Sequence, residues 1–234
     1  MKPYQQILIV ESGEPLIPIP LELFAVESPH PYEKLGAPYG DRSPYYLRQT
    51  VLKKLIEAQN LLQQTHPYWR IQIFDAYRPI EVQKFMVEYT FAELLRAQNL
   101  NLSQISDIEQ QNIWQQVYQF WASPSPDPAT PPPHSTGGAI DITLVNEQGN
   151  PVNMGTAIDE VSPLSYPDYF ANSTNPIERQ YHAYRQLLWS IMQKVGFQRH
   201  PNEWWHFSFG DQMWAWLSNQ ANPHHSLTAR YGRI

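Results

Sequence analysis

The sequence contains no cysteine, no long apolar run and no cluster of basic residues. Without cysteine there is no disulfide, thiolate nucleophile or cysteine-type zinc site, so metal ligands must come from His, Asp and Glu. The aliphatic run at 7–10 is too short for a signal-peptide core, and no stretch approaches a membrane span. The net charge of −6 disfavours nucleic acid and anionic membrane surfaces as partners. We therefore expect a cytoplasmic protein that binds neither nucleic acid nor membrane.

The chain is long enough for one domain with a substantial core. It has 234 residues, and folding buries most of the surface that an unfolded chain of this length exposes. Its 22 prolines are interleaved with apolar residues, which indicates ordered, irregular connections rather than disorder. No repeat or linker divides the sequence. We predict a single domain over residues 1–234, with an extended N-terminal segment at 1–42 and a peripheral polar tail at 218–234.

The spacing of apolar residues predicts an α+β fold. Several segments have apolar residues every three or four positions, as helices do, and capping residues place these helices at about 44–66, 80–98, 106–122 and 176–195. Short segments rich in aliphatic or aromatic residues predict strands at 6–10, 69–74, 139–144 and 203–209. We expect a mostly antiparallel sheet with helices packed against it.

The segment at 131–141 contains the strongest candidate for a functional site. Three prolines precede His134, two glycines follow it, and the apolar strand after them carries Asp141. A buried carboxylate costs several kcal/mol unless something pairs with it, and a divalent metal ion is a suitable partner. We therefore predict that His134 and Asp141 bind one metal ion. Six of the ten residues at 124–133 are proline, and we interpret this run as an ordered loop that frames a cleft.

A second segment, at 203–206, could supply the third metal ligand and the general base that the first segment lacks. Three protein ligands and an open position are typical of a catalytic zinc. His134, Asp141 and His206 could be the ligands, and Glu203 the general base. On a regular strand, residues three apart point to opposite faces. For Glu203 and His206 to reach one site, the chain must bulge or enter the strand at the two tryptophans between them.

More ordinary interpretations stay open at this point. A histidine beside tryptophans in a strand is more often a hydrogen-bonded core residue than a ligand, and Arg78 at a strand end is more often part of a surface salt bridge. The two segments together favour the metal site, because both would otherwise leave costly buried polar groups. The other histidines are assigned to loops, to a polar helix face or to the tail: His30, His66, His182, His200, His224 and His225.

Three motifs resemble those of one enzyme family. Residues 134–141 resemble the H-x-x-G-x-A-x-D motif of the zinc D-Ala-D-Ala peptidases, and residues 203–206 resemble their E-x-W-H motif. Residues 75–79 resemble the Y-R-P segment of the dipeptidase branch, which includes the vancomycin-resistance D-Ala-D-Ala dipeptidases. The similarity covers about residues 43–210. It implies a D-Ala-D-Ala peptidase or hedgehog-like fold and a metallopeptidase that acts in cell-wall (peptidoglycan) chemistry.

The resemblance also implies a role for each residue of the site. His134, Asp141 and His206 would bind one zinc ion per chain. Glu203 would take a proton from the zinc-bound water and later give one to the leaving amine. Arg78 would stabilise the negative charge that grows on the scissile carbonyl oxygen.

Four further residues concern substrate binding. Residues 154–159 resemble a dipeptidase stretch in which an aspartate pairs with the substrate's amino group, so Asp159 could select a dipeptide; a solvated loop aspartate is the alternative. Tyr77 could line the pocket or simply pack. The dipeptidases carry a serine two residues before the first zinc histidine, which helps to hold the substrate carboxylate. Here that position is Pro132, and Ser135 or a backbone amide could substitute.

We therefore predict zinc-dependent hydrolysis of D-alanyl-D-alanine or of a closely related dipeptide. This small substrate is the partner that we expect. One alternative is a D,D-carboxypeptidase that acts on longer cell-wall peptides. Another is a catalytically inactive binding module stabilised by zinc. Glu203 argues against the module, because a purely structural zinc site has no use for a base beside an open position.

Overall fold

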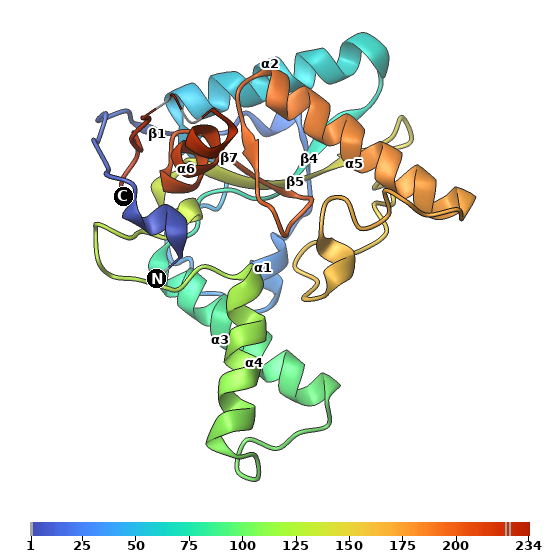
Figure 1. Ribbon diagram of the computed structural model, residues 1–234. Helices are drawn as coiled ribbons and strands as arrows, with labels where there is room; N and C mark the ends of the chain where they lie inside the picture. Colours follow the sequence, from blue (N-terminus) through green and yellow to red (C-terminus); the bar gives the residue numbers. More distant parts are fainter. Residues whose placement is uncertain (1, 223, 225) are drawn as a thin grey trace.

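The computed structural model describes residues 2–222, 224 and 226–234. A five-stranded sheet lies at its centre (Figure 1). The strand order is β2-β4-β5-β7-β6, in which β2 and β4 are parallel and all other neighbours are antiparallel. The strands are β2 (Ala25–Val26), β4 (Arg70–Asp75), β5 (Ala139–Val145), β6 (Gln198–Arg199) and β7 (His206–Ser208). The strand β5 therefore occupies the middle of the sheet.

Two long helices cover one face of this sheet. The helices α2 (Gln49–Thr65) and α5 (Pro176–Lys194) lie side by side above it in Figure 1. Their apolar side chains join Ile140 and Ile142 of β5 in the main core. Because side chains alternate along a strand, Asp141 faces the other side of the sheet, although β5 is buried along its whole length.

A smaller group of helices lies below the sheet in Figure 1. The helices α3 (Ile80–Ala97) and α4 (Asp107–Phe120) pack against each other and, with α1 (Pro31–Lys34), enclose a second apolar cluster. Ser106 begins α4 with the predicted capping box. Its hydroxyl accepts from the Glu109 N–H, and the Glu109 carboxylate accepts from the Ser106 N–H.

Residues from the two ends of the chain pack together. The turn η1 (Pro3–Gln6) lies against α6 (Gln212–Ala221). Ile9 forms an isolated bridge with Ala229, so the predicted strand at the N-terminus is wrong beyond this one bridge. The prediction of a peripheral tail is also wrong in part, because Ala229 and Tyr231 are fully buried.

The first long helix begins later than predicted. Residues Tyr46–Arg48 form β3, which pairs with β1 (Leu16–Pro18) in a separate two-stranded sheet, and α2 starts only after it. The Arg48 N–H donates to the Gly137 carbonyl (3.0 Å). These long-range pairings outweigh the local capping signal near residue 44.

Most of the remaining predicted elements agree with the structure, but the strand expected at 203–209 is limited to β7 (His206–Ser208). The helices expected at 80–98, 106–122 and 176–195 are α3, α4 and α5, and the strands expected at 69–74 and 139–144 are β4 and β5. Two further short turns are η2 (Leu21–Leu23) and η4 (Pro163–Ser165). The predicted α+β fold with a mostly antiparallel sheet is confirmed. In the part of the chain that the structure describes, no helix combines the length and apolar character needed to cross a membrane.

Candidate active site

Three polar residues form a row across the sheet. Asp75 of β4 and His206 of β7 are each paired directly with Asp141 of β5. A register shift between Ile73 and Asp75 places an extra residue of β4 against β5, which turns Asp75 to the face that Asp141 occupies. Because directly paired residues share a face of a sheet, all three side chains point to the side opposite α2 and α5.

Glu203 reaches the same site through the irregularity that the sequence predicts. Residues 201–205 form turns and bends, and β7 begins only at His206. The chain therefore enters the strand after the two tryptophans instead of forming a bulge. Glu203 and His206 can then approach one another even though they are three residues apart.

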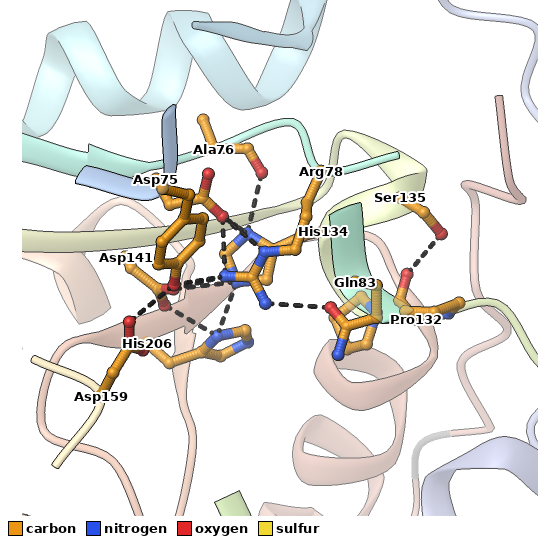
Figure 2. A network of polar contacts seen from close by, with 12 residues as sticks. Asp75, Ala76, Arg78, Gln83, Pro132, His134, Ser135, Asp141, Asp159 and His206 are labelled. Atoms are coloured by element: carbon orange, nitrogen blue, oxygen red, sulfur yellow. Dashed lines mark hydrogen bonds and ion pairs between the residues drawn. The ribbon is translucent and has the colours of Figure 1, made fainter. Parts of the chain in front are cut away.

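His134 lies in a short turn before β5. This turn, η3 (Pro133–Thr136), ends at Gly137, whose φ of 70° is in the left-handed region that favours glycine. A Cβ there would lie 2.5 Å from Leu16 Cδ1, so a side chain at this position would also require Leu16 to move. The turn directs the His134 ring toward Asp141 (Figure 2).

Three donor atoms converge in this site. His134 Nε2 lies 3.1 Å from His206 Nδ1 and 3.2 Å from Asp141 Oδ2. His206 Nδ1 lies 3.0 Å from Asp141 Oδ1. Ligands of a tetrahedral zinc ion, with bonds of about 2.0–2.1 Å, lie roughly 3.3 Å apart. The spacing therefore fits a single metal ion held by these three residues.

Hydrogen bonds behind the two histidines determine which nitrogen faces the site. His134 Nδ1 donates to the Ala76 carbonyl (2.8 Å), which leaves a lone pair on Nε2. The Ser208 hydroxyl donates to Asp211 (2.8 Å), so it accepts from His206 Nε2 (3.2 Å) and leaves a lone pair on His206 Nδ1. Two lone pairs then face each other across 3.1 Å beside a carboxylate. They repel unless a cation lies between them, which is the strongest physical indication of a metal site here.

Glu203 is buried beside these donors without a strong partner. Its Oε2 lies 3.8 Å from His206 Nδ1, and its Oε1 lies 3.5 Å from His200 Nδ1. Because His200 Nδ1 already accepts from the Asn202 N–H, Oε1 has no hydrogen-bond donor among the described residues. Burial raises the pKa of the Glu203 carboxyl well above its ordinary value, and the charge of Asp141 raises it further. A carboxylate in this environment is suited to accept a proton.

Arg78 is buried between acceptors next to the donor atoms. Its Nε–H donates to Asp75 (2.8 Å) and one Nη1–H donates to Gln83 (2.9 Å). The Nη2 hydrogens go to Asp141 (3.2 Å) and to the Tyr32 hydroxyl (3.1 Å). Burial alone would lower the pKa of Arg78, but its anionic neighbours, Asp75 first, raise it well above the ordinary value. Four of the five N–H groups have acceptors among the described residues, which leaves one on Nη1 for a ligand.

Asp159 lies at the other end of this network. Its Oδ2 accepts from the Tyr32 hydroxyl (2.7 Å), which itself accepts from Arg78. Its φ of 66° is left-handed, a conformation that aspartate tolerates better than most residues. Burial raises the pKa of Asp159 to about 7, and the charge of Asp141 contributes in the same direction. Asp159 therefore lies within the site and is not a solvated loop aspartate.

These groups line one cavity with about 440 Å³ of empty space, including its open mouth. Its wall contains the three metal-donor residues together with Arg78, Asp159 and Glu203. Pro133 also lines the cavity, so the proline-rich loop frames it as expected.

Two of the predicted substrate-binding residues lie outside this cavity. The Ser135 hydroxyl donates to the Pro132 carbonyl (2.8 Å) and points away from the donor atoms (Figure 2). The Tyr77 hydroxyl donates to the Ile234 carbonyl (3.3 Å) and borders a different surface hollow. Each hydroxyl is already satisfied by a carbonyl, so neither is directed at a substrate.

Several residues of the site have no role in the sequence-based prediction. His30, assigned to a loop, is buried with its Nε2 3.3 Å from Asp75 Oδ1. Tyr32 links Arg78 to Asp159, and His200 lines the cavity. The signal that could have indicated Asp75 is a carboxylate at the end of an apolar strand, three residues before an arginine. Among the other histidines, His225 lies outside the described residues.

Replacing Asp75 with asparagine should lower the free energy of unfolding by about 3 kcal/mol, because Arg78 would stay buried with one anionic partner fewer. Burial raises the pKa of Asp75, but Arg78 and His30 outweigh it and the pKa falls to about 2. Urea unfolding of the two proteins measures the difference. The matched control is Asp41→Asn on the exposed surface, which should stay within about 0.5 kcal/mol. Equal unfolding midpoints for D75N and the native protein would contradict a stabilising ion pair between Asp75 and Arg78.

The chain is similar to known proteins over its whole length. Residues 26–227 match a family model described as D-ala-D-ala dipeptidase. A D-alanyl-D-alanine dipeptidase from Synechocystis sp. is 50% identical over 240 aligned residues, which cover 100% of this chain and 97% of the relative. The D-alanyl-D-alanine dipeptidase of Escherichia coli is 40% identical over 74 residues, which cover 32% of this chain and 36% of the relative. The solved vancomycin resistance D,D-pentapeptidase VanY, in complex with Zn(II), aligns over 94% of this chain and 95% of its own at 14% identity, with a TM-score of 0.45.

Proposed function

Because the chain belongs to the D-Ala-D-Ala dipeptidase family of metallopeptidases, we propose that it hydrolyses D-alanyl-D-alanine with one zinc ion held by His134, Asp141 and His206. The observation that carries this proposal is the pair of facing histidine lone pairs next to the buried carboxylate of Glu203, all in one cavity. The cavity takes wall residues from both apolar clusters, so we propose further that residues 1–234 act as a single peptidase domain.

The donor set suits zinc, which favours two imidazoles and a carboxylate with a position left open. When bound, zinc would supply a Lewis acid that lowers the pKa of a water toward about 7 and polarises the substrate carbonyl. The Ala76 carbonyl and the Ser208 hydroxyl hold the two imidazole rings from behind. They keep the donor nitrogens free of protons and fixed in direction.

Glu203 acts as the general base and then as the general acid. It accepts a proton from the attacking water while the water oxygen bonds to the carbonyl carbon of the scissile amide. It then passes that proton to the amide nitrogen as the carbon–nitrogen bond breaks, and free D-alanine leaves. The raised pKa of Glu203 supports both steps, because a carboxyl with a raised pKa holds the proton more firmly between them.

Arg78 stabilises the carbonyl oxygen as it gains negative charge. The four acceptors around its guanidinium fix its position, and the remaining Nη1–H can donate into the cavity. A fixed, buried cation requires no reorganisation during the reaction and is worth a few kcal/mol in the transition state.

Asp159 binds the free ammonium group of the dipeptide. Its Oδ2 is held by the Tyr32 hydroxyl, and the residue lines the same cavity as Glu203. A peptide extended at its N-terminus has an amide in place of this ammonium and would leave the carboxylate unpaired. Asp159 therefore favours dipeptides over longer chains.

Release of D-alanine from D-Ala-D-Ala by the purified, zinc-loaded protein tests the proposed function. A tripeptide ending in D-Ala-D-Ala, measured in parallel, tests the alternative of a D,D-carboxypeptidase. Cleavage of the dipeptide alone supports the proposal, and cleavage of the tripeptide at a comparable rate favours the carboxypeptidase. No release from either substrate would contradict both.

Replacing Asp159 with asparagine should raise KM for D-Ala-D-Ala by about 10- to 100-fold, because a charge-assisted hydrogen bond to the ammonium is lost. The pKa of Asp159 is about 7, so its carboxylate takes up a proton as the pH falls through that value. KM of the native enzyme should then rise about fivefold between pH 7 and pH 6. In D159N this rise should be absent.

Steady-state kinetics across this pH range measure both effects. The matched control, Asp107→Asn, changes an exposed aspartate in the first turn of α4 and should keep the native pH profile. If D159N loses dipeptide and tripeptide activity equally, Asp159 supports the structure of the site and does not select the substrate.

A further inference from the structure

The C-terminal carboxylate of a dipeptide needs a binding partner of its own in this cavity. At neutral pH, D-Ala-D-Ala carries one positive and one negative end, and Asp159 accounts only for the positive end. A carboxylate taken out of water costs several kcal/mol unless a donor or cation receives it. The inference that follows rests on the proposed function, because it assumes a substrate with a free carboxylate.

The positively charged side chains of the cavity wall, with one exception, already have anionic partners or are neutral. Arg78 contacts both Asp75 and Asp141. Burial lowers the pKa of His200 well below its ordinary value, and its Nδ1 accepts a hydrogen bond from the backbone. The two metal-site histidines direct lone pairs, not protons, at the site. None of these groups offers an unpaired positive charge to a substrate carboxylate.

Lys2 is the exception. It lines the cavity together with Arg78, Asp159 and Glu203. Its Nζ donates to the Trp121 carbonyl (3.1 Å), so two of its three N–H groups remain for other acceptors. No carboxylate oxygen of the described residues lies within 4.0 Å of this ammonium in an ion pair. Burial lowers its pKa, and the charge of Glu203 partly offsets that effect.

The backbone around Lys2 is anchored, so its side chain has a fixed origin. The Lys2 N–H donates to the Gln5 side chain (2.8 Å) within η1. The buried Gln212 amide of α6 donates to the carbonyls of Ile7 (2.7 Å) and Ala129 (3.0 Å). One side chain thereby ties the N-terminal segment to the proline-rich loop that frames the cavity.

The side chains of Pro132 and Ser135 offer no competing donor. Pro132 has neither a hydroxyl nor an N–H, and the Ser135 hydroxyl is bonded to the Pro132 carbonyl. We propose that the ammonium of Lys2 binds the C-terminal carboxylate of the dipeptide substrate and makes that carboxylate a requirement for efficient hydrolysis. Lys2 and Asp159 then bind the two oppositely charged ends of the same dipeptide.

A comparison of D-Ala-D-Ala with D-alanyl-D-alaninamide, which lacks the carboxylate, tests this role. The native enzyme should prefer the acid in kcat/KM by about 10- to 100-fold. Lys2→Met should lose most of that preference, through a higher KM for the acid, while its activity on the amide stays near the native level. Lys2→Arg should restore much of the preference. Lys84→Met, on the exposed side of α3, is the matched control and should behave as the native enzyme does.

The outcomes separate this role from a merely structural one and from the proposed function. If K2M lowers activity on the acid and the amide equally, Lys2 acts on the site as a whole, through its fold or through the charge of Glu203, and the inference is overturned. If K2M changes neither, the inference is also overturned.

Isothermal titration calorimetry with both compounds, on the native protein and on K2M, covers the case in which neither compound is hydrolysed. Binding of the acid that depends on Lys2, without turnover, would uphold the inference and contradict the proposed function. Absence of binding by both compounds would overturn both.

Discussion

Replacing Glu203 with glutamine should lower kcat for D-Ala-D-Ala by about 10³-fold, with little change in the binding of metal or substrate. Glutamine keeps the size of the side chain and removes its ability to accept a proton. The structure favours a large effect because Glu203 is buried, its Oε1 has no hydrogen-bond donor among the described residues, and the three metal donors lie beside it. No other carboxylate of the cavity wall is free for the same task, since Asp141 faces both histidines and Asp159 is bonded to Tyr32.

The test measures kcat together with the zinc content of each protein. Glu147→Gln, in an exposed turn after β5, is the matched control and should retain native activity. A variant E203Q that keeps its zinc and loses less than about tenfold in kcat would remove Glu203 from the role of base. A loss of zinc in E203Q would instead indicate that the carboxylate is itself a metal ligand.

Removing the metal should abolish measurable hydrolysis, and one equivalent of zinc per chain should restore it. The same treatment should destabilise the protein, because a ligand at about 1,000 times its Kd contributes about 4 kcal/mol to the folded state. The structural reason is the repulsion between His134 Nε2 and His206 Nδ1, which face each other across 3.1 Å beside Asp141.

Thermal unfolding before and after chelation, with metal analysis of both samples, measures these effects. His206→Ala should bind little zinc and show no further change on chelation. His224→Ala, at an exposed site in the tail, should respond as the native protein does. A melting temperature that chelation leaves unchanged in the native protein would contradict a metal between the two histidines.

The central residues of the site could be predicted from sequence because they are polar side chains within or beside apolar segments. Asp141 sits within an apolar strand, and Glu203 and His206 flank two tryptophans, so each polar group needs a partner that its neighbours do not supply. The structure brings His134, Asp141 and His206 together as this reasoning requires. The entry into β7 at His206 was likewise predictable, because alternation along a regular strand would have separated it from Glu203.

The residues that the prediction missed depend on contacts between distant parts of the chain. Tyr32 lies 127 positions from Asp159, its hydrogen-bond partner, and Lys2 lies 119 positions from Trp121. Both come from the first 42 residues, where no apolar period points to a buried face. Ser135 was expected to bind the substrate because of its position in the motif. Its hydroxyl instead donates a local hydrogen bond to the Pro132 carbonyl.

The place of β5 in the middle of the sheet has a consequence for the synthesis of the protein. Its neighbour β7, the last strand in the chain, brings Glu203 and His206 to the site about 65 residues after Asp141. A ribosome adds roughly 5–20 residues per second, so Glu203 and His206 are synthesised several seconds after Asp141. Chains that end before residue 203 lack the proposed base and one proposed metal ligand, so we expect such fragments to have no peptidase activity. Hydrolysis begins only after β7 has been synthesised and has paired with β5, which makes activity a stringent reporter of the completed sheet.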